Sequence, residues 1–371
     1  LERRRYEGRY CVGCEQFFEP GDLDGGLCPE HRRPLESVAE PNWFFRLSRY
    51  QDRLADLIER GELEIEPAGF RAEVLGLLRG GLHDISVSRS VERARGWGVP
   101  VPGDPSQVVA VWFDALTNYI SSLGFGDDGP DYDTWWRRSD HRIHVVGKGI
   151  TRFHAVYWPA FLLSAGEPLP TRIHVHPYLT ADGEKLSKSA GATGSPFEII
   201  DRFGADALRW WIAREVAAGA DTAFTVGRLV GCANADLANG VGNAVSRVVA
   251  LGQRCEIDLP PPDERSPRDL AADLPASVAH ALADFDRQCA ASKISRAIDR
   301  LNRHIEETAP WQLARDPSRR TELADLLAVY AATLRTIGAA IRPIAPDVAA
   351  RVDTQLLPGA VRRSVHQRLE V

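Results

Sequence analysis

The pattern of apolar and polar residues changes twice along the chain. Residues 1–40 are rich in turn formers and have few long apolar runs, which is typical of a small segment stapled by a metal ion. Apolar residues then recur at helical spacing and predict helices over Asn42–Arg60 and Ala72–Arg79, the second ending at Gly80-Gly81.

From about residue 108, short apolar runs alternate with helical patterns. The predicted strands are Val108–Phe113, Arg142–Gly147 and Arg172–Leu179, and the helices after the first two are Ala115–Leu123 and Ile150–Leu163. This alternation predicts a parallel sheet that binds its ligands at the carboxyl ends of the strands. The strands account for about half of a doubly wound sheet, so we expect a further part upstream of Leu1.

After Phe197 the pattern is helical nearly to the end, with a Pro-rich connector at Leu259–Pro267. One long helix is predicted to bury Leu282, Phe285, Ile294, Ile298, Leu301 and Ile305, and another covers Glu322–Ile341. We therefore expect a helical bundle.

Composition and charge narrow the possible partners. The 371 residues predict two or three domains. The 45 Lys and Arg against 51 Asp and Glu give a net charge of −6, so a nucleic acid would have to bind to a local basic patch. The sequence has neither a run of roughly 18 apolar residues nor an apolar signal-peptide core, so we expect no membrane partner.

Two residue types are scarce. The sequence contains no Met, for which a missing upstream part is the simplest explanation and an unusual start codon the alternative. Lysine occurs only at positions 148, 185, 188 and 293, whereas Arg is abundant. The few lysines are expected where a compact ammonium is needed in place of a planar guanidinium.

Three of the six cysteines lie close to a histidine near the start of the chain. Cys11 and Cys14 form one pair of ligands, and Cys28 and His31 form a second. Two such pairs can bind a metal ion in tetrahedral geometry. Three thiolates with one imidazole favour a single structural Zn²⁺ with no coordination position left for water or substrate. The alternative is a chance clustering of these residues. Without a secretory signal, this distribution predicts a reduced, cytoplasmic protein.

A short segment with two lysines, DGEKLSKS, follows the third predicted strand. Lys185 and Lys188 can reach anionic oxygens from a loop, as is useful where negative charge develops during nucleotidyl transfer. The alternative is a solvated basic loop. The scarcity of lysine elsewhere weakens that alternative.

Aromatic residues gather around the first two strand–helix units. Trp112 and Tyr119 belong to the first strand–helix pair, and Phe153, His154 and Trp158 belong to the second strand–helix pair. Such residues near strand ends can line an apolar pocket for a small ligand. The alternative is ordinary core packing, which the residue types favour for Phe153 and Trp158.

These features occur in a chain that resembles the methionyl-tRNA synthetases, a family of class I aminoacyl-tRNA synthetases, over essentially its whole length. The matching stretches are YEGRYCVGCEQFF, NWFFRLSRYQDRL, WGVPVPGDP, VWFDALTNYISSLG, HVVGKGITRFHAVYWPAFLLSAG, DGEKLSKS, PFEIIDRFGADALRWW, NADLANGVGNAVSR and ETAPWQLA.

The resemblance implies an α/β plus all-α fold, namely half of a class I Rossmann-type parallel sheet with a zinc-knuckle insertion, followed by a stem-contact region and an α-helical anticodon-binding bundle. The implied domains are the zinc-knuckle insertion (connective peptide) at 1–105, the second half of the Rossmann domain at 106–190, the stem-contact region at 191–230 and the anticodon-binding domain at 231–371.

The resemblance also assigns residues to sites. The ATP-binding KMSKS loop of the family corresponds to Lys185, Leu186, Ser187, Lys188 and Ser189, with Lys185 and Lys188 as the catalytic groups and Mg²⁺ accompanying ATP. The methionine pocket corresponds to Trp112, Ala115, Tyr119, Phe153, His154 and Trp158. The zinc ligands correspond to Cys11, Cys14, Cys28 and His31. The residues that read the CAU anticodon, by stacking on an unpaired base or bonding its edge, correspond to Asn243, Arg247 and Trp311.

The implied function is methionine–tRNA ligase (EC 6.1.1.10), with methionine, ATP and tRNA(Met) as substrates. The HIGH sequence of the family does not occur in this chain. We therefore expect a C-terminal portion that is inactive alone and that a separately encoded N-terminal half could complete.

Two alternatives stay open. The family's Gly-Lys-Asp is here Gly147-Lys148-Gly149, and AGATGSP follows where the family usually has a Leu-Gly-Asn run and an Asp before the Pro. These differences favour an inactive paralogue or a split subunit that acts as a tRNA-binding module. The other alternative, a zinc-dependent scaffold without a tRNA role, leaves the three anticodon positions unexplained.

Overall fold

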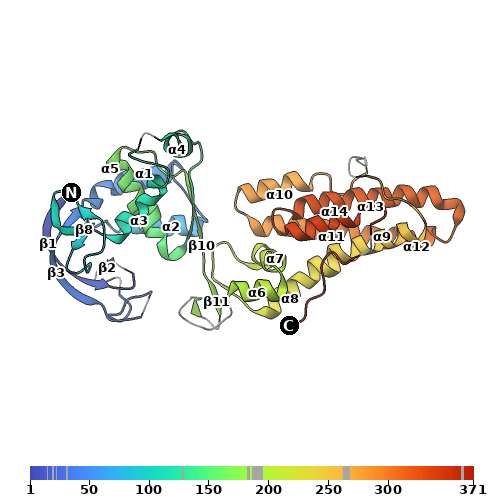
Figure 1. Ribbon diagram of the computed structural model, residues 1–371, viewed down its shortest axis with the longest axis horizontal. Coiled ribbons are helices and arrows are strands. Elements are labelled where there is room, and N and C mark those ends of the chain that lie inside the picture. Colours follow the sequence, from blue (N-terminus) through green and yellow to red (C-terminus); the bar gives the residue numbers. More distant parts are fainter. Residues whose placement is uncertain are drawn as a thin grey trace. The chain divides into compact units, whose positions relative to one another are not determined.

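The computed structural model describes residues 1–14, 16–18, 21, 23–30, 32–127, 129–181, 184–185, 195–261, 268–360 and 363–371. The chain forms two compact units, Leu1–His176 and Pro177–Val371 (Figure 1). The four domains predicted from the sequence divide the chain more finely, and their boundaries stay predictions.

An antiparallel sheet opens the first unit. Its strands lie in the order β2 (Gln16–Phe18), β1 (Glu2–Cys11), β3 (Glu36–Phe45) and β5 (Ile85–Ser86). The predicted helix over Asn42–Arg60 is therefore wrong at its start, because Asn42 pairs with Arg4 and Phe44 with Glu2. The later part is confirmed as a short 3-10 turn followed by α1 (Gln51–Glu59). The second predicted helix is α2 (Ala68–Arg79), which begins four residues earlier than expected.

A second antiparallel sheet has the order β6 (Ser88–Ser90), β8 (Asp104–Val109) and β7 (Pro100–Val101). The prediction that Val108–Phe113 is a strand of the parallel sheet is wrong, because β8 pairs antiparallel with β6 and β7. The second half of that segment is helical, since α3 (Val111–Ser121) begins two residues after β8 ends. The turn forms because the Ala110 carbonyl accepts hydrogen bonds from the backbone N–H groups of Phe113 and Asp114. Trp112 consequently lies on a helix.

The first unit also contains a parallel sheet. Its order is β4 (Glu64–Glu66), β10 (Arg172–His176) and β9 (Ile143–Gly147). The two later strands confirm the sequence prediction, although β10 ends at His176, and β4 was not predicted. A parallel pair needs a crossover connection. Between β9 and β10 it consists of a 3-10 turn, the π-helix Phe153–Tyr157 and α5 (Trp158–Ala165). A shorter helical segment, α4 (Pro130–Tyr132) and the π-helix Asp133–Arg137, precedes β9.

The second unit is mostly helical, as predicted. It begins with β11 (Leu179–Ala181), which pairs with β12 (Glu184–Lys185) and β13 (Thr222–Ala223). Its helices are α6 (Pro196–Phe203), α7 (Ala205–Glu215), α8 (Val226–Ala233), α9 (Asn243–Arg254), α10 (Leu274–Ala283), α11 (Arg287–Thr308), α12 (Pro310–Leu313), α13 (Arg320–Ile341) and α14 (Pro346–Gln355). The π-helix Asn234–Gly242 connects α8 directly to α9.

Two predicted helices of this unit have different outcomes. The helix over Glu322–Ile341 is confirmed as α13. The prediction of a single helix through Leu282 and Phe285 is wrong, because Phe285 has a φ of 58° and separates α10 from α11. Asp286 then caps α11 by accepting a hydrogen bond from the Cys289 N–H.

The segment Pro317–Ile341 is long and apolar enough to cross a membrane by length and composition alone, with a mean hydropathy of 1.4 over 18 residues. More than half of that window, 56%, is buried inside the bundle. This is the pattern of a core helix.

Candidate functional site

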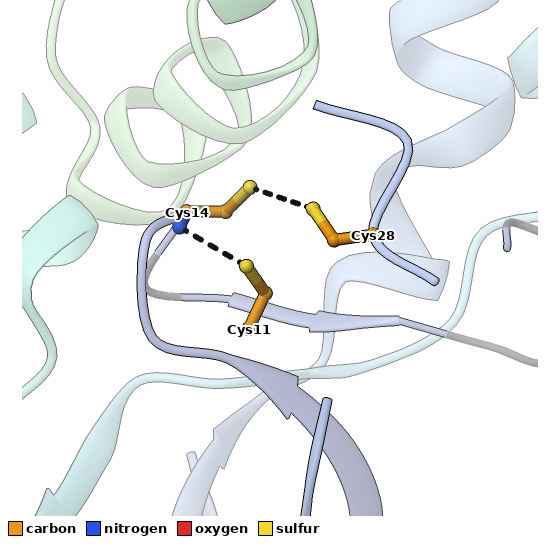
Figure 2. Close-up of side chains that lie close together, drawn as sticks. All are labelled: Cys11, Cys14 and Cys28. Atoms are coloured by element: carbon orange, nitrogen blue, oxygen red, sulfur yellow. Dashed lines mark hydrogen bonds between the residues drawn. The ribbon is translucent and has the colours of Figure 1, made fainter. Parts of the chain in front are cut away.

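Three cysteine thiols meet beside the turn between β1 and β2 (Figure 2). Their sulfur atoms all lie within 4.8 Å of one another, and the Sγ atoms of Cys14 and Cys28 are 3.4 Å apart. Two sulfurs on a tetrahedral zinc ion are about 3.8 Å apart, given a Zn–S bond of about 2.3 Å. Cys11, Cys14 and Cys28 therefore fit three corners of a zinc site. The fourth predicted ligand, His31, lies outside the described residues.

The cysteines of this cluster differ in acidity. Burial raises the pKa of Cys11, but hydrogen bonds from the Cys14 N–H and from the other two thiols outweigh it and hold that pKa below its ordinary value. The pKa of Cys14 is raised by burial and by the two neighbouring thiols. A bound cation would lower the pKa of every cysteine ligand, Cys14 included, because it favours the deprotonated form.

Aromatic residues from α3 and the π-helix Phe153–Tyr157 pack together, as the sequence predicted. The rings of Trp112 and Phe153 stack with their centroids 3.8 Å apart. The Tyr119 hydroxyl lies 2.8 Å from Nε2 of His154, whose Nδ1 lies 2.9 Å from the Ile150 carbonyl. Because a carbonyl can only accept, Nδ1 carries the proton and Nε2 accepts from the Tyr119 hydroxyl.

The six predicted pocket residues differ in exposure. Phe153, His154 and Trp158 are buried, Trp112 and Tyr119 are half-buried, and Ala115 is exposed. Trp112 and Phe153 also line a cavity of about 340 Å³, together with side chains that include Phe44, Arg93 and Arg152. The stacked pair is thus the part of the predicted methionine pocket that borders this cavity.

A hydrogen bond joins the cysteine cluster to the aromatic cluster. Nε1 of Trp112 donates to the backbone carbonyl of Cys14 at 3.0 Å. The loop that carries a predicted metal ligand therefore fixes the orientation of an indole in the predicted pocket.

His144 belongs to the aromatic cluster and was missed in the sequence. Its Nε2 accepts a hydrogen bond from Nε1 of Trp158 at 3.2 Å, and its ring centroid lies 4.2 Å from that of Tyr119. Burial, helped by the nearby His154, lowers the pKa of His144 to about 4. No sequence signal marked it, because the alternation in β9 predicts that Ile143 and Val145 are buried, whereas the structure exposes both and buries the histidine between them.

This low pKa predicts that acid destabilises the first unit. Below pH 6.5 the unfolded chain binds a proton that folded His144 binds only near pH 4, so the free energy of unfolding falls as the pH drops between these values. The total loss is about 3 kcal/mol, at about 1.4 kcal/mol per pKa unit. His144→Gln keeps an acceptor for Trp158 and should remove this part of the slope in urea unfolding at pH 7 and pH 4.5. An identical slope in the wild type and the variant would contradict the account.

The structure tests little of the predicted ATP loop. The backbone of Lys185 ends β12, where it pairs with Thr180. Leu186, Ser187, Lys188 and Ser189 lie outside the described residues, so the arrangement of the two catalytic lysines stays a prediction.

The bundle brings two of the predicted anticodon residues together. Arg247 of α9 and Trp311 of α12 line a cavity of about 350 Å³ with the apolar side chains of Leu251, Ile305 and Leu327 among others. The Arg247 guanidinium carbon lies 5.4 Å from the Trp311 ring centroid. Trp311 is half-buried, so part of its indole stays accessible.

Two further charged side chains, Glu306 and Arg254, lie close to Arg247 or to the cavity that it lines. Nη2 of Arg247 forms an ion pair with Oε1 of Glu306 at 2.6 Å, and Arg254 lies on the cavity wall. Asn243 is exposed one helical turn before Arg247, hence on the same face of α9. Neither Glu306 nor Arg254 was identified from the sequence, in which an isolated charge on a helix looks like a solvated surface residue.

Residues 2–249, more than half of the chain, match the family model described as tRNA synthetases class I (M). The chain belongs to this family. Membership confirms the resemblance to methionyl-tRNA synthetases and agrees with the mixture of α/β and helical structure.

Several relatives of this class I synthetase chain carry the name Methionine--tRNA ligase. The one from Caldanaerobacter subterraneus subsp. tengcongensis is 39% identical over 363 residues, which are 96% of this chain and 56% of that protein. The one from Brucella suis biovar 1 is 39% identical over 358 residues, which are 94% of this chain and 68% of that protein. The chain therefore spans little more than half the length of the first relative.

A solved structure of Mycobacterium tuberculosis methionyl-tRNA synthetase in complex with methionyl-adenylate has the same fold as this synthetase chain. The TM-score is 0.87 with 32% sequence identity, and the match covers 99% of this chain and 77% of that chain.

Proposed function

We propose that this chain serves in a methionine–tRNA ligase and that its helical unit reads the anticodon of tRNA(Met). The observation that carries the proposal is the cavity bordered by both Arg247 and Trp311. An aromatic face can stack on an unpaired base while a guanidinium bonds the base edge or a phosphate. The names of the relatives support methionine as the amino acid.

The proposed reaction has two steps. The methionine carboxylate attacks the α-phosphorus of ATP and releases pyrophosphate, which leaves methionyl-adenylate. The 2′-hydroxyl of the terminal tRNA adenosine then attacks the carbonyl carbon, and AMP leaves. Lys185 and Lys188 stabilise the negative charge that develops on phosphate oxygens in the first step, with Mg²⁺ accompanying ATP.

The first unit would hold the amino acid and a structural metal. The proposed methionine pocket uses the stacked Trp112 and Phe153, because a thioether packs well against aromatic rings. Tyr119 would be oriented by its hydrogen bond to His154. The zinc ligands would be Cys11, Cys14, Cys28 and His31, and zinc there would fix the fold of the knuckle.

One observation favours a second candidate, a tRNA-binding module without adenylate formation. Gly149 lies in the 3-10 turn directly after β9, at the position where the family has an Asp, so a carboxylate is missing there. Methionine-dependent pyrophosphate exchange distinguishes the two. Exchange by the chain, alone or supplied with the N-terminal region of a relative, supports the ligase, whereas tRNA binding without exchange in either case supports the module.

The proposed anticodon recognition predicts a specific loss of binding. We expect a tRNA(Met) transcript with all three anticodon bases replaced to bind at least 10-fold more weakly than the CAU transcript in filter-binding assays. Both titrations must use the same ionic strength, since phosphate contacts make affinity salt-dependent. Equal affinities for the two transcripts would overturn the proposal.

A further inference from the structure

A π-helix lies directly before the residues proposed to read the anticodon. α8, the π-helix Asn234–Gly242 and α9 follow one another without a gap. A π-helical hydrogen bond spans five residues in place of four, so a π turn takes up more residues than an α turn. One residue corresponds to about 100° of rotation around an α-helix. The π-helix therefore determines which side chains of α9 face the cavity.

The start of this π-helix is fixed by its neighbours. The Asn234 side chain accepts a hydrogen bond from the Leu369 N–H at 2.8 Å and donates one to the Leu369 carbonyl at 2.9 Å. Asp236 accepts from Nε1 of Trp210 at 2.9 Å and lies 3.4 Å from Nε of Arg214. A rotation of this end would break all four interactions.

The other end is fixed by α11 and by the cavity. Nδ2 of Asn302 donates to the Gly240 carbonyl at 3.3 Å, and Arg247 pairs with Glu306 four residues further along α11. Both ends of the π-helix are thus tied to the bundle, and a regular α-helix of the same length would misalign one of them.

Two glycines leave room for this geometry. A Cβ on Gly242 would lie 2.9 Å from the Leu237 carbonyl oxygen, and one on Gly240 would lie 3.2 Å from the Ala235 carbonyl oxygen. Each of these carbonyls belongs to the residue five positions earlier, which is the partner in a π-helical hydrogen bond. Alanine has the highest α-helix propensity, so a side chain at Gly242 disfavours the π turn and favours the α turn.

We propose that the π-helix Asn234–Gly242 positions α9 for anticodon recognition, with Gly242 and Asn302 as its positioning residues. This inference rests on the proposed function. It adds that the rotation of α9, as well as the identity of its side chains, determines which anticodon is bound.

The test compares Gly242→Ala with Gly231→Ala. Gly231 lies in α8, and a Cβ there has no neighbouring atom within 4 Å. The first readout is the ratio of the Kd for the transcript with the replaced anticodon to the Kd for the CAU transcript. The second is the midpoint of thermal unfolding of each variant. We expect Gly242→Ala to lower this ratio at least 10-fold and also to lower the midpoint, because its Cβ would meet the Leu237 backbone carbonyl, and Gly231→Ala to keep the wild-type ratio and midpoint.

A double-mutant cycle separates positioning from general destabilisation. If Gly242→Ala turns Arg247 away from the cavity, adding Arg247→Ala should weaken CAU binding by less than 2-fold. A full Arg247→Ala effect in the Gly242→Ala background would overturn the inference. If Gly242→Ala does not fold, Asn302→Ala decides, with a 3- to 10-fold lower ratio expected and an unchanged ratio contradicting the inference. A wild-type chain that does not discriminate between anticodons would instead refute the proposed function.

Discussion

Trp311→Ala is expected to weaken the binding of tRNA(Met) about 5- to 150-fold. Stacking of a base on an aromatic side chain contributes about 1–3 kcal/mol per base, and about 1.4 kcal/mol corresponds to a factor of ten. The indole lies on the cavity wall beside Arg247 with part of its surface accessible, which is the arrangement that stacking requires. Filter binding at a fixed salt concentration measures the loss.

Two variants control this experiment. Trp311→Phe keeps an aromatic face and should retain most of the affinity. Trp135→Ala also removes a tryptophan, one that is 66% exposed in the first unit, and should bind the anticodon loop like the wild type. Because Trp311 also packs against the core of the bundle, thermal unfolding must show that Trp311→Ala is folded. A folded Trp311→Ala protein with wild-type affinity would contradict the stacking role.

Cys28→Ser is expected to abolish zinc binding and to lower the melting temperature of the first unit. Cys28 is fully buried beside Cys11 and Cys14, and the small cluster around them contains few other buried apolar side chains. Structural zinc supplies about 10–16 kcal/mol of apparent binding free energy in zinc-finger peptides, so its loss should unfold the knuckle. Metal analysis should give one zinc per wild-type chain.

Cys289→Ser is the matched control, since this thiol lies in α11 of the second unit, and the variant should keep its zinc. Tryptophan fluorescence, compared with that of a Trp112→Phe variant, provides a second readout, because the Trp112 indole donates to the Cys14 carbonyl and should be released when the knuckle unfolds. Zinc retention by Cys28→Ser, or wild-type protein without zinc after growth in zinc-supplemented medium, would contradict the proposed site.

Local patterns predicted those parts of the fold that depend on local contacts. The apolar spacing of α13 predicted a helix whose buried face follows directly from periodicity. The apolar run of β9 predicted the strand, although not which of its faces is buried. The pattern failed at Asn42–Phe45, since partners from the start of the chain draw that segment into β3. It failed again at Phe285, where a single left-handed residue separates α10 from α11.

The sequence also predicted some residues of the candidate sites and missed others. The spacing of Cys11, Cys14 and Cys28 indicated a cluster, and the structure brings their sulfurs together. The resemblance placed Arg247 and Trp311 in one site, and they share a cavity. His144 was missed because its role depends on Trp158 in the following helix. The π-helix before α9 was not predicted either, since its geometry depends on contacts with Asn302 and Leu369 from other parts of the chain.

The most direct test of the central claim transfers the anticodon to a different tRNA. A transcript of a non-cognate tRNA would be compared with the same transcript carrying CAU in its anticodon, at one salt concentration. If the cavity beside Arg247 and Trp311 reads CAU, the transplanted transcript should bind at least 10-fold more tightly, and Trp311→Ala should remove the gain. Equal binding of the two transcripts by the wild-type chain would show that the bundle does not recognise this anticodon.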